Sequence, residues 1–296
     1  MRHNIAFSSD GVTLQGWLYL PELGHAPFAT VVMAHGFALV KEQGLEQYAE
    51  AFSAAGLAVV VFDNRNLGAS EGEPRQDIDP WQQARDYRSA ITFAQSLPEI
   101  DSTRIGVWGT SYSGAVALQV AAVDKRVKAV VVQVPGISGI DMTNRALSLE
   151  QKAGLLALLE AERVRLVRGE SPATLQFVAP DASVPATFPE PRSYDYYTRT
   201  GTSVPTWRNE ITIRSLDRWL EHDVTGFLRQ IAPTPLLMIL ASEDQISPTD
   251  LQLAAFATAR EPKKLVVVSG DHYTAYVEKF SVFATEATNW FVQCLT

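Results

Sequence analysis

The chain has very little cysteine and no long apolar run, and each absence excludes a class of protein. Its one cysteine, Cys294, cannot form an internal disulfide, which fits a reducing compartment. No uninterrupted apolar stretch approaches the roughly 18 residues of a membrane-spanning helix. The first ten residues also lack the apolar segment of a secretory signal. We therefore expect a cytoplasmic protein with no membrane partner, and we expect Cys294 to belong to the core.

An excess of basic charge and clusters of metal ligands are lacking as well. The net charge of -8 argues against a nucleic-acid partner. No group of histidine, cysteine and carboxylate residues has ligand spacing, so neither a metal nor a cofactor is implied. With 296 residues, 46% of them hydrophobic, the chain can build one large α/β domain that carries an insertion. The sequence does not determine the oligomeric state, and a homodimer is compatible with it.

Apolar strands alternate with amphipathic helices through most of the chain, which predicts a mostly parallel sheet with helices on both faces. Residues 12–20 alternate and end at Pro21, so an early antiparallel strand is expected. Further strands are expected at 30–34, 57–62, 105–108, 127–134, 235–241 and 264–269. The final helix is expected to bury one stripe, made by Tyr276, Phe280, Phe283, Ala287, Trp290 and Cys294.

This alternation stops between residues 138 and 227. A helical stretch over 149–168 is followed there by a region rich in proline and aromatic residues. We interpret 138–227 as an inserted helical cap, and 1–137 with 228–296 as one core domain. Such an insertion commonly roofs a site and shapes its pocket. The candidate pocket walls are Leu155, Leu156, Leu158, Leu159 and the tyrosine-rich stretch 194–197.

Ser111 stands at the junction of an apolar strand and an alanine-rich helix. A serine becomes a nucleophile when a sharp turn exposes it and a base removes its proton. Small residues are needed two positions before and after it, and Gly109 and Ser113 fill these places. Because the second of them is usually glycine, an ordinary turn before a helix is the alternative interpretation.

A base and an acid for Ser111 are expected at the carboxyl edge of the sheet, where open α/β sheets gather their chemistry. His272 directly follows the last strand, and Asp244 follows the strand before it. Glu243 and Asp141 are alternative acids. The chain order Ser111, Asp244, His272 is typical of the α/β-hydrolase architecture.

A place for a negatively charged oxygen is expected beside Ser111. In this arrangement one donor is the backbone N–H after the nucleophile, here that of Tyr112. The other comes from the loop after an early strand, where Phe37 follows His35 and Gly36. His35 is expected to support that loop, and the alternative for Phe37 is a side chain that only lines the pocket.

Four segments resemble landmarks of the α/β-hydrolase superfamily, in the order in which that superfamily has them: 34–37, 62–70, 109–114 and 269–272. Within it, the chain is similar to dienelactone-hydrolase-like and X-Pro-peptidase-like serine hydrolases. Residues 72–81, 105–114 and 233–238 resemble the thiohydrolase and polyketide-transferase group. Dienelactone hydrolases have cysteine where this chain has Ser111, so their substrate is not carried over.

Together the residues and the resemblance imply a serine hydrolase or acyltransferase. It would act on an ester or thioester of an apolar acyl chain, free or bound to a carrier. Ser111, His272 and Asp244 would form the triad, and the amides of Phe37 and Tyr112 the oxyanion hole. Two alternatives are a small-peptide (X-Pro-like) hydrolase and a non-catalytic binding protein on a hydrolase fold.

Overall fold

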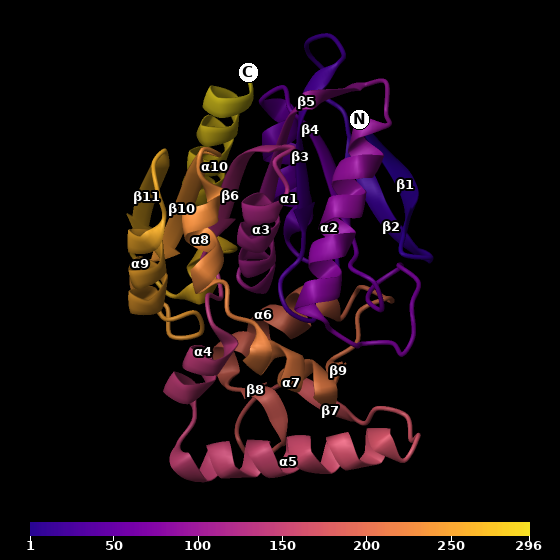
Figure 1. Cartoon of the computed structure of the whole chain (residues 1–296), viewed down its shortest axis with the longest axis vertical. Coiled ribbons are helices and arrows are strands. Elements are labelled where there is room, and N and C mark those ends of the chain that lie inside the picture. The colour runs from indigo at the N-terminus through magenta and orange to yellow at the C-terminus, as the bar shows by residue number, and fades with distance from the viewer.

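Eight strands form one sheet through the middle of the computed structural model, which describes residues 1–296 (Figure 1). The strand order is β1-β2-β4-β3-β5-β6-β10-β11. β1 and β2 pair antiparallel, and the six strands from β4 to β11 are parallel, as expected. The bounds are β1 Arg2–Ser9, β2 Val12–Tyr19, β3 Phe28–Ala34, β4 Ala58–Phe62, β5 Ile100–Thr110, β6 Val127–Gln133, β10 Leu236–Ala241 and β11 Lys263–Val268.

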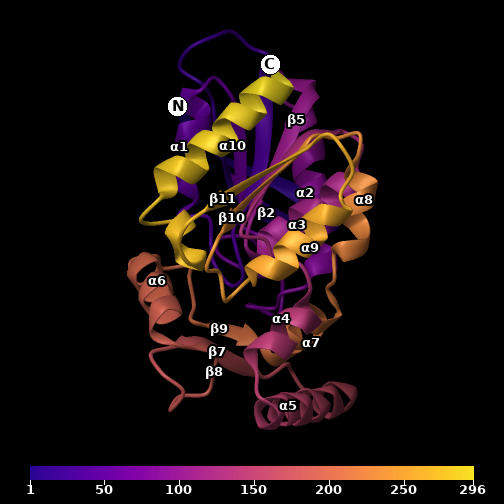
Figure 2. The same ribbon diagram turned by 90° about the vertical axis from the view of Figure 1, so that its left-hand side faces the viewer.

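Helices cover both faces of this sheet (Figure 2). One face packs on α1 (Leu45–Ala54) and α10 (Phe280–Leu295). The other packs on α2 (Pro80–Gln95), α3 (Tyr112–Val123), α8 (Leu228–Ile231) and α9 (Thr249–Thr258). Successive strand residues point to opposite faces, so Val31 and Val32 of β3 belong to different core clusters. The parallel strands are therefore apolar at nearly every position.

The stripe predicted for the last helix is correct at Phe283 and Ala287, which are fully buried, and wrong at its two ends. Tyr276 lies outside α10, just after the short 3-10 helix η2 (His272–Ala275). The chain turns between Tyr276 and Phe280, so counting helical periods from Tyr276 fails. Phe291 and Leu295 are buried where Trp290 and Cys294 were expected, and Cys294 is only half-buried at the edge of the core.

Between β6 and β10 the chain leaves the main sheet and folds at the edge where the parallel strands end (Figure 1). We call residues 138–227 the cap. Besides helices it contains a sheet, β8-β7-β9, whose short strands bounded by proline gave no clear alternation in the sequence. None of the helices has the length and apolarity needed to cross a membrane. The cap elements are α4 Gly139–Ala146, α5 Leu149–Val167, β7 Thr174–Ala179, β8 Ala186–Pro189, α6 Pro191–Gly201, β9 Glu210–Thr212, α7 Ile213–Glu221 and the 3-10 helix η1 Thr225–Phe227.

A buried carboxylate fastens the cap to the core. Asp77, in the loop before α2, accepts hydrogen bonds from Thr212 (2.7 Å), Arg214 (2.6 and 2.8 Å) and Arg218 (2.8 Å). Burial raises the pKa of Asp77, but the hydrogen bonds from the two arginines outweigh it and leave the pKa below its usual value. This contribution to stability is complete above the unfolded-state pKa of about 3.9. It is lost as the pH falls through the lower folded-state pKa.

We expect Asp77→Asn to lower the free energy of unfolding by about 2–4 kcal/mol at pH 7, because two arginines lose their buried partner. Urea denaturation measures this loss, and limited proteolysis locates it in the cap. Asp217→Asn is the matched control, since its partner Arg163 is exposed and such a pair contributes less than about 1 kcal/mol. Equal losses in the two variants would contradict the assigned role of Asp77.

Candidate active site

The loops that follow β5, β10 and β11 bring Ser111, Asp244 and His272 together at the carboxyl edge of the sheet. Ser111 Oγ lies 3.0 Å from His272 Nε2, and His272 Nδ1 lies 2.8 Å from Asp244 Oδ2. Asp244 and His272 are buried, whereas Ser111 is partly exposed. Side chains separated by 161 and 28 positions thus form one chain of hydrogen bonds, in the arrangement that the sequence predicts.

The turn at Ser111 has an unusual backbone, with φ 52° and ψ -122°. Gly109 is required there because an added Cβ would collide with the backbone of Ser113. Ser113 is fully buried, and its Oγ accepts from the Thr110 amide (3.0 Å) and donates to the Ala34 carbonyl (2.8 Å). The serine that replaces the usual glycine therefore joins the ends of β5 and β3.

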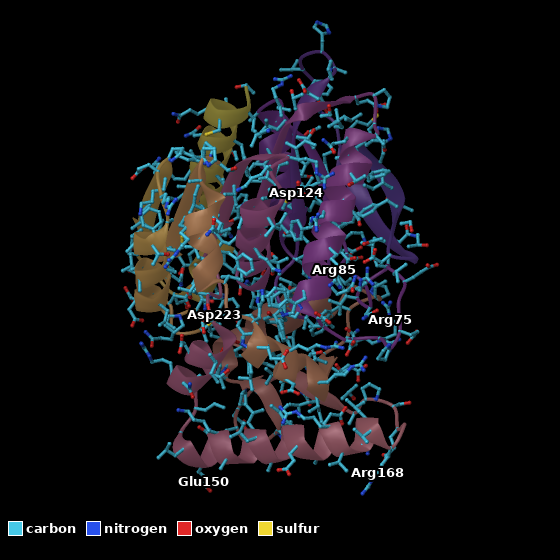
Figure 3. All side chains as sticks on the ribbon, viewed as in Figure 1. Arg75, Arg85, Asp124, Glu150, Arg168 and Asp223 are labelled. Atoms are coloured by element: carbon cyan, nitrogen blue, oxygen red, sulfur yellow. The ribbon has the colours of Figure 1, made fainter.

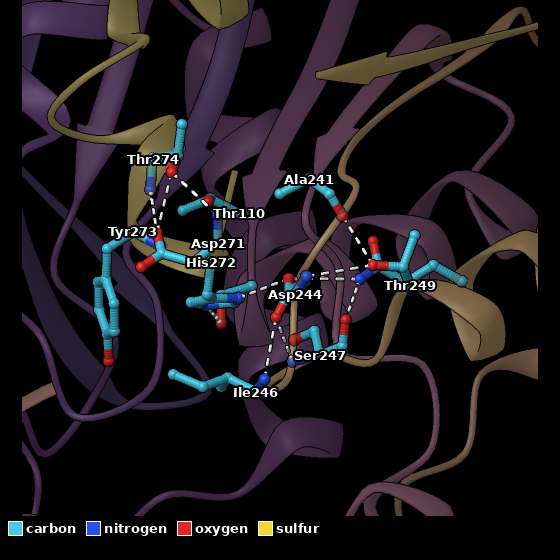
Figure 4. A network of polar contacts seen from close by, with 12 residues as sticks. Thr110, Ala241, Asp244, Ile246, Ser247, Thr249, Asp271, His272, Tyr273 and Thr274 are labelled. Atoms are coloured by element: carbon cyan, nitrogen blue, oxygen red, sulfur yellow. Dashed lines mark hydrogen bonds and ion pairs between the residues drawn. The ribbon is translucent and has the colours of Figure 1, made fainter. Parts of the chain in front are cut away.

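The carboxylate of Asp244 is held in one orientation (Figure 4). Its Oδ1 accepts from the amides of Ile246 (3.0 Å) and Ser247 (2.8 Å), which leaves Oδ2 facing His272. Glu243 is exposed to solvent, and Asp141 is exposed on α4. The structure thus places Asp244 on the imidazole and neither of the two alternative acids.

His272 begins the short helix η2, and its neighbour Asp271 caps that helix. The Asp271 carboxylate accepts from the amides of Tyr273 and Thr274 (Figure 4) and from Arg192 of the cap (3.0 Å). Burial raises the pKa of Asp271. The hydrogen bonds from Arg192 and Thr274 lower the pKa by more than burial raises it, so the pKa is below its usual value. Since Nδ1 of His272 faces a carboxylate, Nδ1 carries the proton and Nε2 is free to accept one from Ser111.

His35 orients the loop that carries Phe37. Its Nδ1 donates to the Gly36 carbonyl (2.9 Å), and its Nε2 accepts from the Asn64 amide (3.2 Å). Burial lowers the pKa of His35, which keeps the ring neutral. In a planar trans peptide the Gly36 carbonyl and the Phe37 N–H point in opposite directions, so fixing one fixes the other. His35 supports the loop, as the sequence predicts.

The amides expected to bind an oxyanion have no acceptor within the protein: neither Phe37 N–H nor Tyr112 N–H donates a hydrogen bond to another residue. Their loops meet at Ser111, because a Cβ built on Gly36 would lie 3.8 Å from the Ser111 Cβ. The rings of Phe37 and Tyr112 also pack edge to face, 4.9 Å apart. Two free donors therefore lie on the residues that flank the serine.

Aromatic residues of the cap contact this same loop. Tyr197 donates to the Phe37 carbonyl (3.0 Å), and Trp207 donates to the Ala38 carbonyl (3.1 Å). Trp219 packs on the rings of Phe37 and Tyr112, with centroids 5.9 and 5.8 Å away. The sequence interpretation missed Trp207 and Trp219. Their only signal is that they are aromatic residues within an insertion.

The structure buries only some of the residues predicted as pocket walls. Leu159 and Tyr197 are buried in the core cluster that includes Phe37, and Leu155 and Leu158 pack against it. Leu156 and Asp195 were wrong, because both are exposed to solvent. The 3.6-residue period of α5 turns Leu156 away from the face that carries Leu155 and Leu159.

Two hollows, of about 760 and 510 Å³, lie between α6 and the core, the second of them beside α1, and neither is lined by Ser111, Asp244 or His272. They share Tyr196, Arg199 and Val277. The Tyr196 ring packs on Tyr273 and Tyr276, at 4.9 and 5.3 Å, and both of these also contact His272. A layer of tyrosines thus separates the hollows from the serine, which lies beneath the cap.

A family model, curated proteins and a solved structure that are similar to this chain are all hydrolases or polyketide transferases. The family model described as X-Pro dipeptidyl-peptidase (S15 family) matches residues 10–274. A thiohydrolase of Eupenicillium brefeldianum is 32% identical over 91% of this chain and 86% of its own length. A polyketide transferase of Aspergillus fumigatus is 34% identical over 89% of this chain and 87% of its own. The crystal structure of an α/β-hydrolase from Penicillium sp. sh18 superposes with a TM-score of 0.85 at 28% identity, covering 100% of this chain and 99% of that one.

We expect a fluorophosphonate probe to label Ser111 alone, because only this serine has both access and a neighbouring imidazole. Mass spectrometry of the labelled peptide identifies the site. Ser111→Ala should abolish labelling, whereas Ser113→Ala should retain it and lower stability by about 1–3 kcal/mol through the lost buried hydrogen bonds. Labelling of Ser113, or persistent labelling of the Ser111→Ala variant, would show that the reactive serine is misassigned.

Proposed function

Since the chain belongs to the X-Pro dipeptidyl-peptidase (S15) family and is an enzyme of the α/β-hydrolase type, we propose that it transfers acyl groups from esters or thioesters through Ser111. The acceptor is water, an alcohol or an amine. The observation that carries the proposal is the continuous set of hydrogen bonds from Ser111 through His272 to Asp244. The names of the relatives, thiohydrolase and polyketide transferase, support an acyl substrate.

In the first step the Ser111 oxygen attacks the acyl carbonyl carbon, and its proton passes to His272 Nε2. The imidazolium that forms is stabilised by Asp244, whose orientation is fixed by the amides of Ile246 and Ser247. The negative charge on the carbonyl oxygen is received by the amides of Phe37 and Tyr112. Each such donor contributes about 3–4 kcal/mol to the transition state.

In the second step the bond to the alcohol or thiol leaving group breaks, and His272 returns its proton to that group. An acyl-Ser111 ester remains. Water, an alcohol or an amine then gives a proton to His272 and attacks the ester carbon. The bond from that carbon to Ser111 Oγ breaks, His272 returns the proton to Ser111, and an acid, a new ester or an amide is released. The same three side chains serve both halves of the reaction, and no further group is needed.

The aromatic surroundings of Ser111 support an apolar acyl chain. Phe37, Tyr112 and Trp219 pack on one another, and Phe177 adjoins Phe37 at 5.6 Å. An added Cβ on Gly136 would lie 2.9 Å from the Trp219 ring, and the Gly136 amide donates to the Ser111 carbonyl. Trp219 therefore stands next to the backbone of the proposed nucleophile, where it would contact the acyl group.

A substrate panel tests the proposal directly. Acyl N-acetylcysteamine thioesters, p-nitrophenyl esters and X-Pro p-nitroanilides are compared under one condition, with and without added alcohols and amines. We expect turnover of thioesters and esters, with an acylated Ser111 peptide visible by mass spectrometry at early times. If the X-Pro substrates are cleaved and the esters and thioesters are not, the protein is instead a small-peptide hydrolase.

We expect Asp244→Asn to lower kcat by about 10³–10⁴-fold, because the amide favours the wrong imidazole tautomer. His272→Ala should remove turnover. Glu243→Gln is the matched control. Because the Glu243 carboxylate is exposed, this substitution should leave kcat unchanged. Initial rates with one ester measure all three variants, and near-normal rates for Asp244→Asn would mean that another group orients His272.

Acyl-chain preference should depend on Trp219. Each buried methylene contributes roughly 0.8 kcal/mol, so two or three added carbons should raise kcat/KM by about tenfold or more. Trp219→Ala should move the optimum to longer chains by opening space beside Ser111. Leu156→Ala, in the cap but exposed, is the control and should leave the profile unchanged. A flat profile from acetyl to octanoyl, unmoved by Trp219→Ala, would contradict an acyl pocket at this place.

A further inference from the structure

The long cap helix α5 is apolar on the face that nothing covers. Leu149 (85% exposed), Leu156 (58%), Val164 (45%) and Val167 (89%) are four of the chain's exposed large apolar side chains. The opposite face is also apolar: Leu159 is buried, and Leu155 and Leu158 pack against the cap. A helix at the surface of a monomer usually presents a polar outer face, so this pattern indicates a partner.

The exposed side chains form one stripe. Intervals of seven, eight and three residues separate them, and these keep to one side of a helix with 3.6 residues per turn. The stripe runs the length of α5, about 27 Å at 1.5 Å per residue. α5 lies at the end of the molecule farthest from the main sheet, with its outer side free (Figures 1 and 2).

The two ends of the stripe are symmetric about the middle of the helix. Leu149 and Val167 each stand nine residues from position 158, the midpoint of the stripe. Two copies of a helix that pack antiparallel across a twofold axis place such positions opposite each other. The same register places Leu156 of each copy opposite Glu160 of the other, two residues from the midpoint.

The charges at the two ends are also complementary. Glu150 and Arg168 are exposed at opposite ends of α5 (Figure 3), and neither forms an ion pair within the chain. In an antiparallel pair each Glu150 would face the Arg168 of the other copy. Residues 149–168 carry three acidic and four basic side chains, although the whole chain has a net charge of -8. Two copies can therefore meet here without the repulsion that the rest of the surface imposes.

We propose that the protein associates with a second copy of itself through antiparallel packing of the exposed face of α5, about a twofold axis at the level of residue 158 along the helix. One helix pair buries less than the roughly 800 Å² per partner of a standard interface, so the affinity should be micromolar. An anionic membrane surface is the less favoured occupant, because the negative net charge of the chain would be repelled from it.

Sedimentation velocity over a concentration series tests the association with the full chain. We expect a monomer–dimer equilibrium that Leu156→Glu shifts to monomer by at least tenfold in Kd. Val282→Glu is the matched control, because Val282 is an exposed residue of α10, far from α5 in the fold. This variant should associate like the unaltered chain. Circular dichroism confirms that the variants keep their helix content. A chain that stays monomeric at every concentration, or a Leu156→Glu variant that associates normally, would overturn the proposal.

Charge reversal tests the antiparallel arrangement itself. Glu150→Arg and Arg168→Glu should each weaken association, because like charges then face each other, and the double variant should restore it. If the double variant is as weak as the single ones, the ends of α5 do not pair and the arrangement is wrong. Co-flotation of a monomeric chain with anionic phospholipid vesicles, abolished by Leu156→Glu, would replace the second copy with a membrane surface.

Discussion

The backbone of Ser111 is the constraint on which the site depends. A non-glycine residue at φ 52° and ψ -122° costs about 1–3 kcal/mol, and it persists only where neighbouring structure enforces it. Here the Ser111 amide donates to the Gln133 carbonyl (2.9 Å), and the Gly136 amide donates to the Ser111 carbonyl (3.0 Å). Ser113 adds the link to β3. The parallel sheet thus holds the serine in the one orientation that reaches His272.

The cap is more than a cover, because its side chains form hydrogen bonds with two loops of the site. Tyr197 and Trp207 hold the carbonyls of the Phe37 loop, and Arg192 holds the capping residue of the His272 helix. Asp77 joins the far side of the cap to the core. Under the proposed function, a cap fastened at these places positions the oxyanion donors and the base, so a loss of cap stability should lower the reaction rate.

The sequence indicated the chemistry better than its surroundings, and the reason is physical. Ser111, Asp244 and His272 follow apolar strands directly, and parallel strands end at one edge, so local patterns place all three. The contacts of Trp207 and Trp219 join residues far apart in the chain, and no local pattern encodes them. The phase of α10 and the outward face of Leu156 depend on where a helix begins and on what covers it. What covers the exposed apolar face of α5 depends on a second molecule, which the sequence of one chain does not describe.

The three histidines near the cap are all buried, and they differ in their hydrogen-bond partners. His35 is neutral, and both of its ring nitrogens are hydrogen-bonded to the backbone of neighbouring loops. Burial lowers the pKa of His222 to about 4, and its Nε2 contacts Gln119. His272 differs because one nitrogen faces a fixed carboxylate and the other faces a hydroxyl that reaches solvent. In the proposed reaction, the reactivity of His272 comes from this difference between its two nitrogens. Among the three linked side chains Ser111 alone is partly exposed, and the proposed reaction needs an incoming carbonyl to reach that side chain.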